Sequence, residues 1–323
     1  MHSLEDLQAI IQKKIDGFCR KNGEESILQP VNYILQLGGK RIRPLLTLLS
    51  ADLFNDDIED AVYPAIAMEI FHNFTLMHDD IMDNAPLRRG RPTVHERWNR
   101  DVAILSGDAM LIQAYQLIVK TNTSRLPAVL DTFNTTSIEV CKGQQLDMDF
   151  QSRNDVSIDE YIEMIRLKTS VLLGGSMKIG AIIAGASAHD QQHIYDFAID
   201  LGISFQLWDD YLDTFGDATK IGKKVGGDIL ANKKTFLMIQ AMQQSNTEQH
   251  AMLMNLLEDS QQSERKVELI TQLFRDLKLD MLLQQQVDYY YNRALQNLAA
   301  IETMIERKSK ITALATSLRH REF

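Results

Sequence analysis

Cysteine is scarce in this chain, and long apolar runs are missing. Only Cys19 and Cys141 occur among the 323 residues. Two cysteines cannot build a disulfide framework, which favours a reducing, cytoplasmic location. No apolar run reaches the roughly 20 residues that cross a bilayer, so we expect no transmembrane segment. Residues 1–14 mix charged and apolar side chains without an apolar secretory core, which predicts no signal peptide.

Proline is also rare, and its distribution favours helices. All six prolines lie within the first 127 residues, so nothing interrupts long helices in the rest of the chain. Apolar residues there recur at helical steps, as from Ile162 to Ile165 and from Leu167 to Val171. Residues 199–207 alternate as a strand would. The apolar pattern continues at steps of three and four to Phe215, so we expect a buried helix.

No strands alternate with helices, and no linker rich in proline, glycine or serine divides the chain. Hydrophobic residues make up 45% of the sequence, enough to bury a large core. Length alone allows two domains as readily as one. The sequence therefore predicts an all-α fold, and we expect a single helical domain over residues 1–323.

The formal net charge is −10, which argues against a nucleic-acid partner. An acidic chain can still bind anionic substrates through a local basic cluster.

Two aspartate clusters close apolar segments. Their members are Asp79, Asp80 and Asp83, and Asp209, Asp210 and Asp213. On a helix, positions i and i+4 share a face, so like charges repel there. A single cluster of this kind is as consistent with a solvated helix end as with a metal site. Two clusters that both follow apolar segments favour a bound divalent cation. Mg²⁺ prefers one or two carboxylates with water and phosphate oxygens. We therefore expect facing helices that hold Mg²⁺ ions and a diphosphate.

Basic residues gather near both clusters. They comprise Lys40, Arg41 and Arg43 after Gly38-Gly39, Arg88, Arg89 and Arg91 after the first aspartates, Lys168, and Lys223, Lys224, Lys233 and Lys234. Each group alone reads as surface charge. Together they can neutralise two diphosphates, with bidentate contacts from arginine.

These motifs resemble the trans-isoprenyl diphosphate synthases, which include farnesyl and geranylgeranyl diphosphate synthases. The resemblance runs in order from residue 35 to 235. It includes the segments at 38–44, 79–83 with Arg88-Arg89-Gly90, 143–147, Lys168-Thr169, 205–210, and Gly227-Asp228 with Lys233. It implies an isoprenoid-synthase fold, a single large helical bundle with a central active-site cavity, and a homodimer.

The resemblance also implies residue roles. The diphosphate of isopentenyl diphosphate would be bound without metal by Lys40, Arg43, His72 and Arg89. The allylic diphosphate would be bound by Arg88, Lys168, Lys223 and Lys233. Three Mg²⁺ ions would have Asp79, Asp83 and Asp209 as main ligands, with Asp80, Asp210 and Asp213 acting through waters or supporting contacts. The allylic carbocation would face Thr169 and Gln206, and Gln144 and Asp147 would support the site.

The implied reaction is a head-to-tail condensation. Mg²⁺ and basic side chains stabilise the departing diphosphate. The double bond of isopentenyl diphosphate then attacks the allylic cation, and the departed diphosphate takes up the proton that is lost. Water must be excluded. The 216–227 loop and the tail at 319–321 are candidates to close over the site.

Phe74 is the candidate chain-length residue. It lies five residues before Asp79, about 7.5 Å along a helix, so its ring can form a floor below the growing chain. An aromatic here resembles short-chain synthases, which predicts products of fifteen to twenty carbons, with twenty favoured. Simple core packing is the alternative for Phe74, as it is for His72 and Gln206.

Other functions stay open at this point. A class I terpene cyclase shares the aspartate-rich helix but needs no second diphosphate pocket. A non-catalytic prenyltransferase subunit typically loses one aspartate motif, and this chain keeps both. A medium- or long-chain synthase and a plain helical scaffold are further alternatives.

Overall fold

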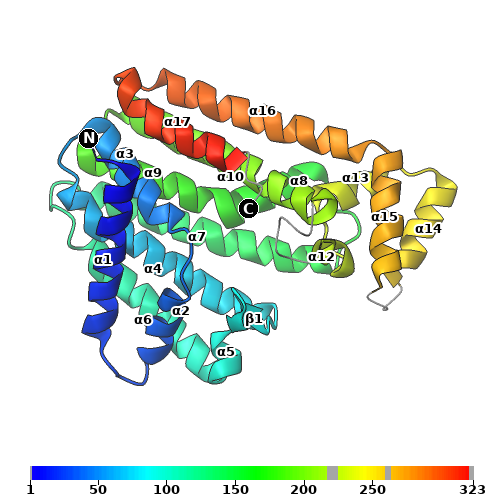
Figure 1. The fold of residues 1–323 in the computed structure, drawn as a ribbon, viewed down its shortest axis with the longest axis horizontal. Coiled ribbons are helices and arrows are strands. Elements are labelled where there is room, and N and C mark those ends of the chain that lie inside the picture. Colours follow the sequence, from blue (N-terminus) through cyan, green and yellow to red (C-terminus); the bar gives the residue numbers. More distant parts are fainter. Residues whose placement is uncertain (1, 217–224, 259–262, 320–323) are drawn as a thin grey trace. The chain divides into compact units, whose positions relative to one another are not determined.

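Helices make up nearly all of the regular structure of the described residues. The computed structural model describes residues 2–216, 225–258 and 263–319 (Figure 1). The predicted all-α fold is confirmed. The chain divides into two compact units, and several helices contribute residues to both. The expectation of one domain stays a prediction.

The first unit contains residues 1–137, 172–195 and 300–311. Its elements are α1 (Leu4–Asn22), α2 (Gln29–Gln36), α3 (Ile42–Phe54), α4 (Glu59–Met82), β1 (Leu87–Arg88), β2 (Arg91–Pro92), α5 (Val94–Arg97), α6 (Arg100–Ile118) and α9 (Val171–Ala184), with the starts of α7 (Leu126–Gln151), α10 (Ala188–Phe215) and α17 (Ile305–Arg319).

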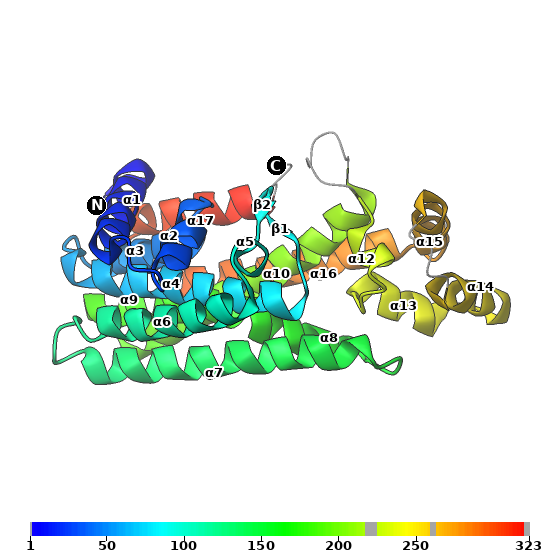
Figure 2. The same ribbon diagram turned by 90° about the horizontal axis from the view of Figure 1, so that it is seen from below.

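The core of the first unit forms around α4. This helix lies alongside α6 in both views and also packs against α3 (Figures 1 and 2). Phe71, Met68 and Met110 are almost completely buried there. Ser50 on α3 donates a hydrogen bond to the carbonyl of Met177 on α9 over 2.6 Å. These contacts hold the carboxyl end of α4, which carries the first aspartate cluster.

The short antiparallel pair β1–β2 follows the first aspartate cluster. Arg88 pairs with Arg91, and the turn between them has φ of 53° at Arg89 and 73° at Gly90. Positive φ at both central residues fits a type I′ hairpin turn. A non-glycine residue at positive φ is strained, and such residues cluster at functional sites.

The second unit contains residues 138–171, 196–299 and 312–323. Besides the remaining parts of α7, α10 and α17, its elements are α8 (Ile158–Ile165), the π-helix η1 (Arg166–Ser170), α12 (Gly227–Leu230), α13 (Phe236–Gln244), α14 (Thr247–Glu258), α15 (Glu264–Asp276) and α16 (Leu279–Ala300). Helices α14 and α15 lie side by side (Figures 1 and 2).

Local sequence signals start the helices of this unit. Ser157 forms a capping box with Glu160 at the start of α8, each side chain bonding the other's backbone N–H. The expected helix through residues 199–215 is confirmed as part of α10. Phe197, Leu207 and Leu283 are completely buried on α10 and α16.

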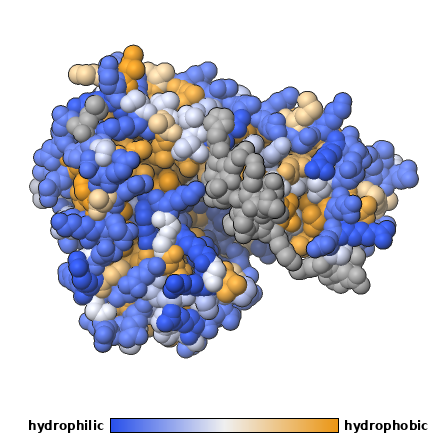
Figure 3. All heavy atoms as spheres, in the orientation of Figure 1, coloured by the Kyte–Doolittle hydropathy of each residue, from blue (hydrophilic) through white to orange (hydrophobic). Residues whose placement is uncertain are grey.

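One segment, Ile158–Ala184, is long and apolar enough to cross a membrane by length and composition. Because 72% of its apolar window is buried inside the protein, it is typical of a core helix. On the face drawn in Figure 3, hydrophilic residues predominate and hydrophobic ones form separate patches.

Candidate active site

The first aspartate cluster occupies the carboxyl end of α4. Asp79 is partly exposed, Asp83 caps the helix in the open, and Asp80 is 2% exposed. Arg88 donates two hydrogen bonds to the carboxylate of Asp80, with Nε at 2.8 Å from Oδ2 and Nη2 at 2.7 Å from Oδ1. The charge of Asp80 is therefore neutralised by Arg88. Asp79 and Asp83 remain on the more accessible side of the cluster.

The second aspartate cluster occupies the carboxyl end of α10. Asp210 is 4% exposed and accepts a hydrogen bond from the hydroxyl of Tyr161 on α8. Burial, with the negative charge of Asp228 adding to it, raises the pKa of Asp210 to about 8. The same burial and the neighbouring Asp210 charge raise the pKa of Tyr161 well above its ordinary value. Asp209 is more accessible than Asp210.

Both clusters sit where a helix least favours negative charge. The carboxyl end of a helix carries a partial negative charge, and neither α4 nor α10 has a basic residue in its last turn. Within the described ranges, no group of three His, Cys, Asp or Glu side chains converges on one point. Two accessible carboxylates on one helix end suit Mg²⁺, which takes its other ligands from water and phosphate.

A positively charged cluster of side chains lies in the first unit. Its members are Arg41, Arg43, His72, Arg88 and Arg89. Arg41 pairs with Glu69 at 2.6 Å. In the described part of the chain, Arg43 and Arg89 form no ion pair, and Nε of Arg43 has no hydrogen-bond partner. Two guanidinium groups therefore stay without a carboxylate.

The electrostatics of this cluster favour a bound anion. Burial lowers the pKa of Arg43 to about 10, opposed by Glu69 and helped by Arg89. Burial and the surrounding arginines lower the pKa of His72 well below its usual value, so its imidazole is neutral at pH 7. A cluster with this excess of positive charge is stabilised by a bound phosphate group.

Gly39 leaves space for the side chain of Arg89, a member of the positively charged cluster. Nη1 of Arg89 donates to the carbonyl of Gly38. A Cβ at position 39 would lie 2.7 Å from Nη1 and Nη2 of Arg89, and Gly39 has φ of 127°. Only glycine fits here without a shift. Lys40, which was also predicted to bind the diphosphate of isopentenyl diphosphate, follows Gly39 directly in the chain.

The π-helix η1 presents Lys168 and Thr169 in the second unit. Nζ of Lys168 pairs with Asp147 on α7 at 2.5 Å. Thr169 Oγ1 lies 3.4 Å from Oε1 of Gln206 on α10. Gln144, one turn before Asp147, is buried. These contacts link α7, η1 and α10 within the second unit. The predicted residues on these three elements are Gln144, Asp147, Lys168, Thr169 and Gln206.

Lys233 belongs to a second group in the same unit. Its Nζ lies 2.9 Å from Asp228, whose backbone N–H donates to Asp213 over 3.0 Å. Burial alone would lower the pKa of Lys233, but Asp228, Asp147 and Asp210 outweigh it and raise the pKa. Burial and Asp228 raise the pKa of Asp213. Lys223 and most of the predicted closing loop lie outside the described residues, as do 320 and 321 in the tail.

Phe74 faces an aromatic row in the first unit. Its ring centroid lies 5.5 Å from that of Phe71 and 4.7 Å from the ring of His78. Phe71 in turn contacts Phe133 at 5.4 Å. Phe71 is 1% exposed, whereas Phe74 is partly accessible. The partly accessible ring of Phe74 thus packs against the buried ring of Phe71. The role of Phe74 in limiting chain length stays a prediction.

Several supporting residues were not predicted as site residues. Tyr161 bonds Asp210, and Glu69 bonds Arg41 of the basic group, but nothing in the local sequence of either one marks it. Asp228, which pairs with Lys233, belongs to the Gly227-Asp228 motif but had no assigned role. Gly143 is a clearer case: a Cβ there would lie 2.6 Å from the carbonyl carbon of Leu167 and 2.6 Å from Cα of Lys168. A glycine inside a long predicted helix is a signal for such close backbone approach.

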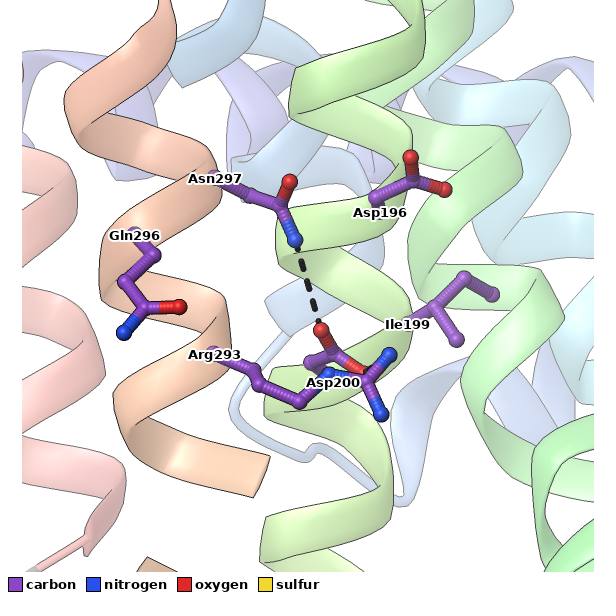
Figure 4. Close-up of a pocket in the computed structure, with 6 residues that line it drawn as sticks. All are labelled: Asp196, Ile199, Asp200, Arg293, Gln296 and Asn297. Atoms are coloured by element: carbon purple, nitrogen blue, oxygen red, sulfur yellow. Dashed lines mark hydrogen bonds and ion pairs between the residues drawn. The ribbon is translucent and has the colours of Figure 1, made fainter. Parts of the chain in front are cut away.

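A cavity of the second unit lies away from the predicted site residues. It has a volume of about 440 Å³ and lies between α10 and α16, with Asp196, Ile199 and Asp200 from α10 and Arg293, Gln296 and Asn297 from α16 (Figure 4). Asp200 pairs with Arg293 at 3.2 Å and accepts from Asn297 at 3.3 Å. None of these residues belongs to the predicted site. The central active-site cavity stays a prediction.

Comparison with known proteins decides the family. Residues 24–276 match the sequence profile of the family described as polyprenyl synthetase. The chain belongs to this family. The resemblance seen in the sequence is confirmed, and the chain is a trans-prenyltransferase with the all-α isoprenoid-synthase fold.

Individual relatives carry more specific names. The geranylgeranyl diphosphate synthase of Sulfolobus acidocaldarius is 37% identical over 289 residues, which are 88% of this chain and 84% of that protein. A crystal structure of a geranylgeranyl pyrophosphate synthase has a TM-score of 0.94 and 41% identity, covering 99% of each chain. The geranylgeranyl pyrophosphate synthase from Corynebacterium glutamicum, solved with isoprenyl diphosphate and magnesium, has a TM-score of 0.86 and 25% identity, covering 98% of each.

Proposed function

We propose that this prenyltransferase condenses isopentenyl diphosphate head-to-tail with an allylic diphosphate, in a reaction that requires Mg²⁺. Its product is a short all-trans prenyl diphosphate of fifteen to twenty carbons, with twenty favoured. The partners are therefore the two diphosphates. The names of the relatives support the reaction class and the favoured product length.

One observation carries the proposal: the pair of guanidiniums without carboxylates in the first unit. Arg43 and Arg89 lie beside neutral His72, next to two arginines that already have acidic partners. A cluster with this many cationic donors suits a diphosphate bound without metal. A terpene cyclase has no second diphosphate to bind, so this cluster favours a synthase.

Mg²⁺ fits the two helix ends. Asp79 and Asp83 would hold it on α4, and Asp209 on α10; we infer three ions with bound diphosphate. When bound, Mg²⁺ neutralises the charge that develops on the departing diphosphate. A relative solved with magnesium supports this assignment. Asp80 and Asp210 are engaged by Arg88 and Tyr161, which fits a supporting role.

The protein's own residues have separate tasks in this scheme. Arg43, His72, Arg89 and Lys40 would orient isopentenyl diphosphate. Arg88, Lys168, Lys223 and Lys233 would bind the allylic diphosphate. Thr169 and Gln206 present oxygen atoms that can stabilise positive charge on the allylic fragment.

We also infer a homodimer in the cytoplasm. The exposed face of α6 carries Leu105, Ile112 and Tyr115, at steps of seven and three, and the exposed Val119 follows four residues later at the C-cap. Such an apolar stripe on a surface helix is suited to a second copy of the chain. Sedimentation of the wild type and of Ile112→Glu tests it: the variant should sediment as a monomer, and a monomeric wild type would refute the dimer.

The purified chain, assayed alone, tests the proposed function. Diphosphate release should require isopentenyl diphosphate, an allylic primer and Mg²⁺, and should stop with a chelator. Asp79→Ala and Asp209→Ala should each lower the rate by several orders of magnitude, because they organise the charge stabilisation. Release from the allylic substrate alone would indicate a cyclase. No turnover without a second protein would indicate a non-catalytic subunit.

A further inference from the structure

Two histidines face each other at the start of α10, outside the proposed diphosphate and Mg²⁺ sites. His189 and His193 are one helical turn apart. Their Nε2 atoms are 3.1 Å apart, and their ring centroids 4.4 Å apart. The side chain of His189 is 56% exposed, so a solute ion has access.

The distance between the two Nε2 atoms is that of a chelate. Two metal–nitrogen bonds of about 2.0–2.1 Å, at right or tetrahedral angles, place the nitrogens about 2.8–3.4 Å apart. Without metal, one ring must donate a proton to the other at this distance. A divalent ion can replace that shared proton with little movement of either ring. Histidines at i and i+4 on a helix are a known arrangement for zinc.

A buried carboxylate lies close to Nδ1 of His189. Oδ1 of Asp190 lies 3.5 Å from its Nδ1. Asp190 is fixed by Ser187 Oγ at 2.8 Å and by the backbone N–H of Glu302 at 2.9 Å. A carboxylate facing Nδ1 favours a proton on that atom and leaves the Nε2 lone pair for a metal. The contact between Asp190 and His189 is a second observation that favours metal binding, separate from the distance between the two histidines.

We propose that His189 and His193 form a binding site for a divalent transition-metal ion such as Zn²⁺. Imidazole suits Zn²⁺, whereas Mg²⁺ prefers oxygen, so the site is chemically distinct from the aspartate clusters. No third His, Cys, Asp or Glu joins the pair in residues 2–216, 225–258 and 263–319, so water completes the coordination.

The surroundings make this a reversible site rather than a structural one. The amino end of a helix disfavours a cation, and the Asp190 carboxylate offsets this effect. A bound ion would cross-link the first turn of α10. Through Asp190, it would also stabilise the segment that contains Glu302.

Calorimetric titration with Zn²⁺ tests the proposal. The full chain is purified without a polyhistidine tag and kept in saturating Mg²⁺, which occupies the carboxylate sites. His193→Gln removes one nitrogen, and His250→Gln, at a lone exposed histidine on α14, is the matched control. We expect one Zn²⁺ per chain in the wild type and the control. His193→Gln should bind at least about tenfold more weakly.

Nitrogen NMR of the imidazoles gives a readout that is independent of enzyme activity. Zn²⁺ should shift the Nε2 signals of His189 and His193 and leave that of His250 unchanged. Equal Zn²⁺ binding by the wild type and His193→Gln would overturn the proposal. So would imidazole signals that do not respond to Zn²⁺, because the pair would then be only a hydrogen bond.

Discussion

Arg43 illustrates how much of the proposed site depends on single side chains. Burial lowers its pKa to about 10, and no carboxylate in the described part of the chain pairs with it. Lys233, in the other unit, is paired with Asp228. The two cations therefore have different surroundings, as separate diphosphate pockets would require.

Arg43→Ala should mainly raise the KM for isopentenyl diphosphate. Losing a charge-assisted hydrogen bond costs about 1.5–3 kcal/mol, roughly a 10- to 100-fold effect. Lys233→Ala should instead act on the allylic substrate. Steady-state kinetics with each substrate varied in turn checks both variants. If each variant affected both substrates equally, the two-pocket assignment would fail.

Phe74 is the residue on which we expect product length to depend. Its ring is partly accessible and packs against Phe71 and His78. Phe74→Ala should open the floor and lengthen the product by at least one isoprene unit, as measured by mass spectrometry. Thr75→Ala is the matched control, because its hydroxyl bonds the carbonyl of His72 and its loss leaves the ring in place. An unchanged product from Phe74→Ala would remove Phe74 from this role.

At the scale of elements, close helix contacts decide where site residues point. The π-helix η1 places Lys168 and Thr169, and π-bulges inside helices are frequent at functional sites. Gly143 on α7 allows the backbone of η1 to come into contact. The irregular turn therefore depends on tertiary packing as well as on its own residues.

Gly143→Ala should destabilise the protein by about 1–3 kcal/mol, because the new Cβ would overlap the backbone at Lys168. Urea unfolding measures this free energy. Gly17→Ala is a control on α1, where a Cβ meets nothing within 4 Å. It should stabilise by about 0.5–1 kcal/mol through helix propensity. Equal effects of the two substitutions would contradict the close contact between α7 and η1.

Asp200 links α10 to α16 and predicts a pH dependence. Burial raises its pKa to about 6, opposed by Arg293 and helped by Asp196. Because the folded pKa lies above the unfolded value of 3.8, the folded state binds more protons. Its contribution to stability is present below pH 4 and is lost as the pH rises to about 6.

Asp200→Asn should remove this dependence. Relative to the wild type, its unfolding free energy should increase between pH 4 and pH 8 by at most about 3 kcal/mol. Denaturant titrations at several pH values measure the difference. A constant difference across this range would show that Asp200 keeps an ordinary pKa.

At the scale of the whole molecule, the sequence predicted the fold class and the family correctly. Proline distribution and helical periodicity indicated an all-α chain, and the ordered motifs indicated a prenyl synthase; both are confirmed. The assigned residue roles, the single domain and the central cavity stay predictions.

Other features could not be predicted because they arise from contacts distant in sequence. Tyr161 meets Asp210 across 49 residues, and Arg41 meets Glu69 across 28. The Arg89-Gly90 turn needs positive φ at an arginine, which local preference disfavours. Such partners follow from packing and not from local pattern.

The most direct test of this account is the mass of the product that the purified chain makes from isopentenyl diphosphate and an allylic primer with Mg²⁺. We expect an elongated all-trans prenyl diphosphate, with twenty carbons as the main product. A product of thirty carbons or more would contradict the short-chain assignment. The absence of any elongated product would contradict the proposed condensation itself.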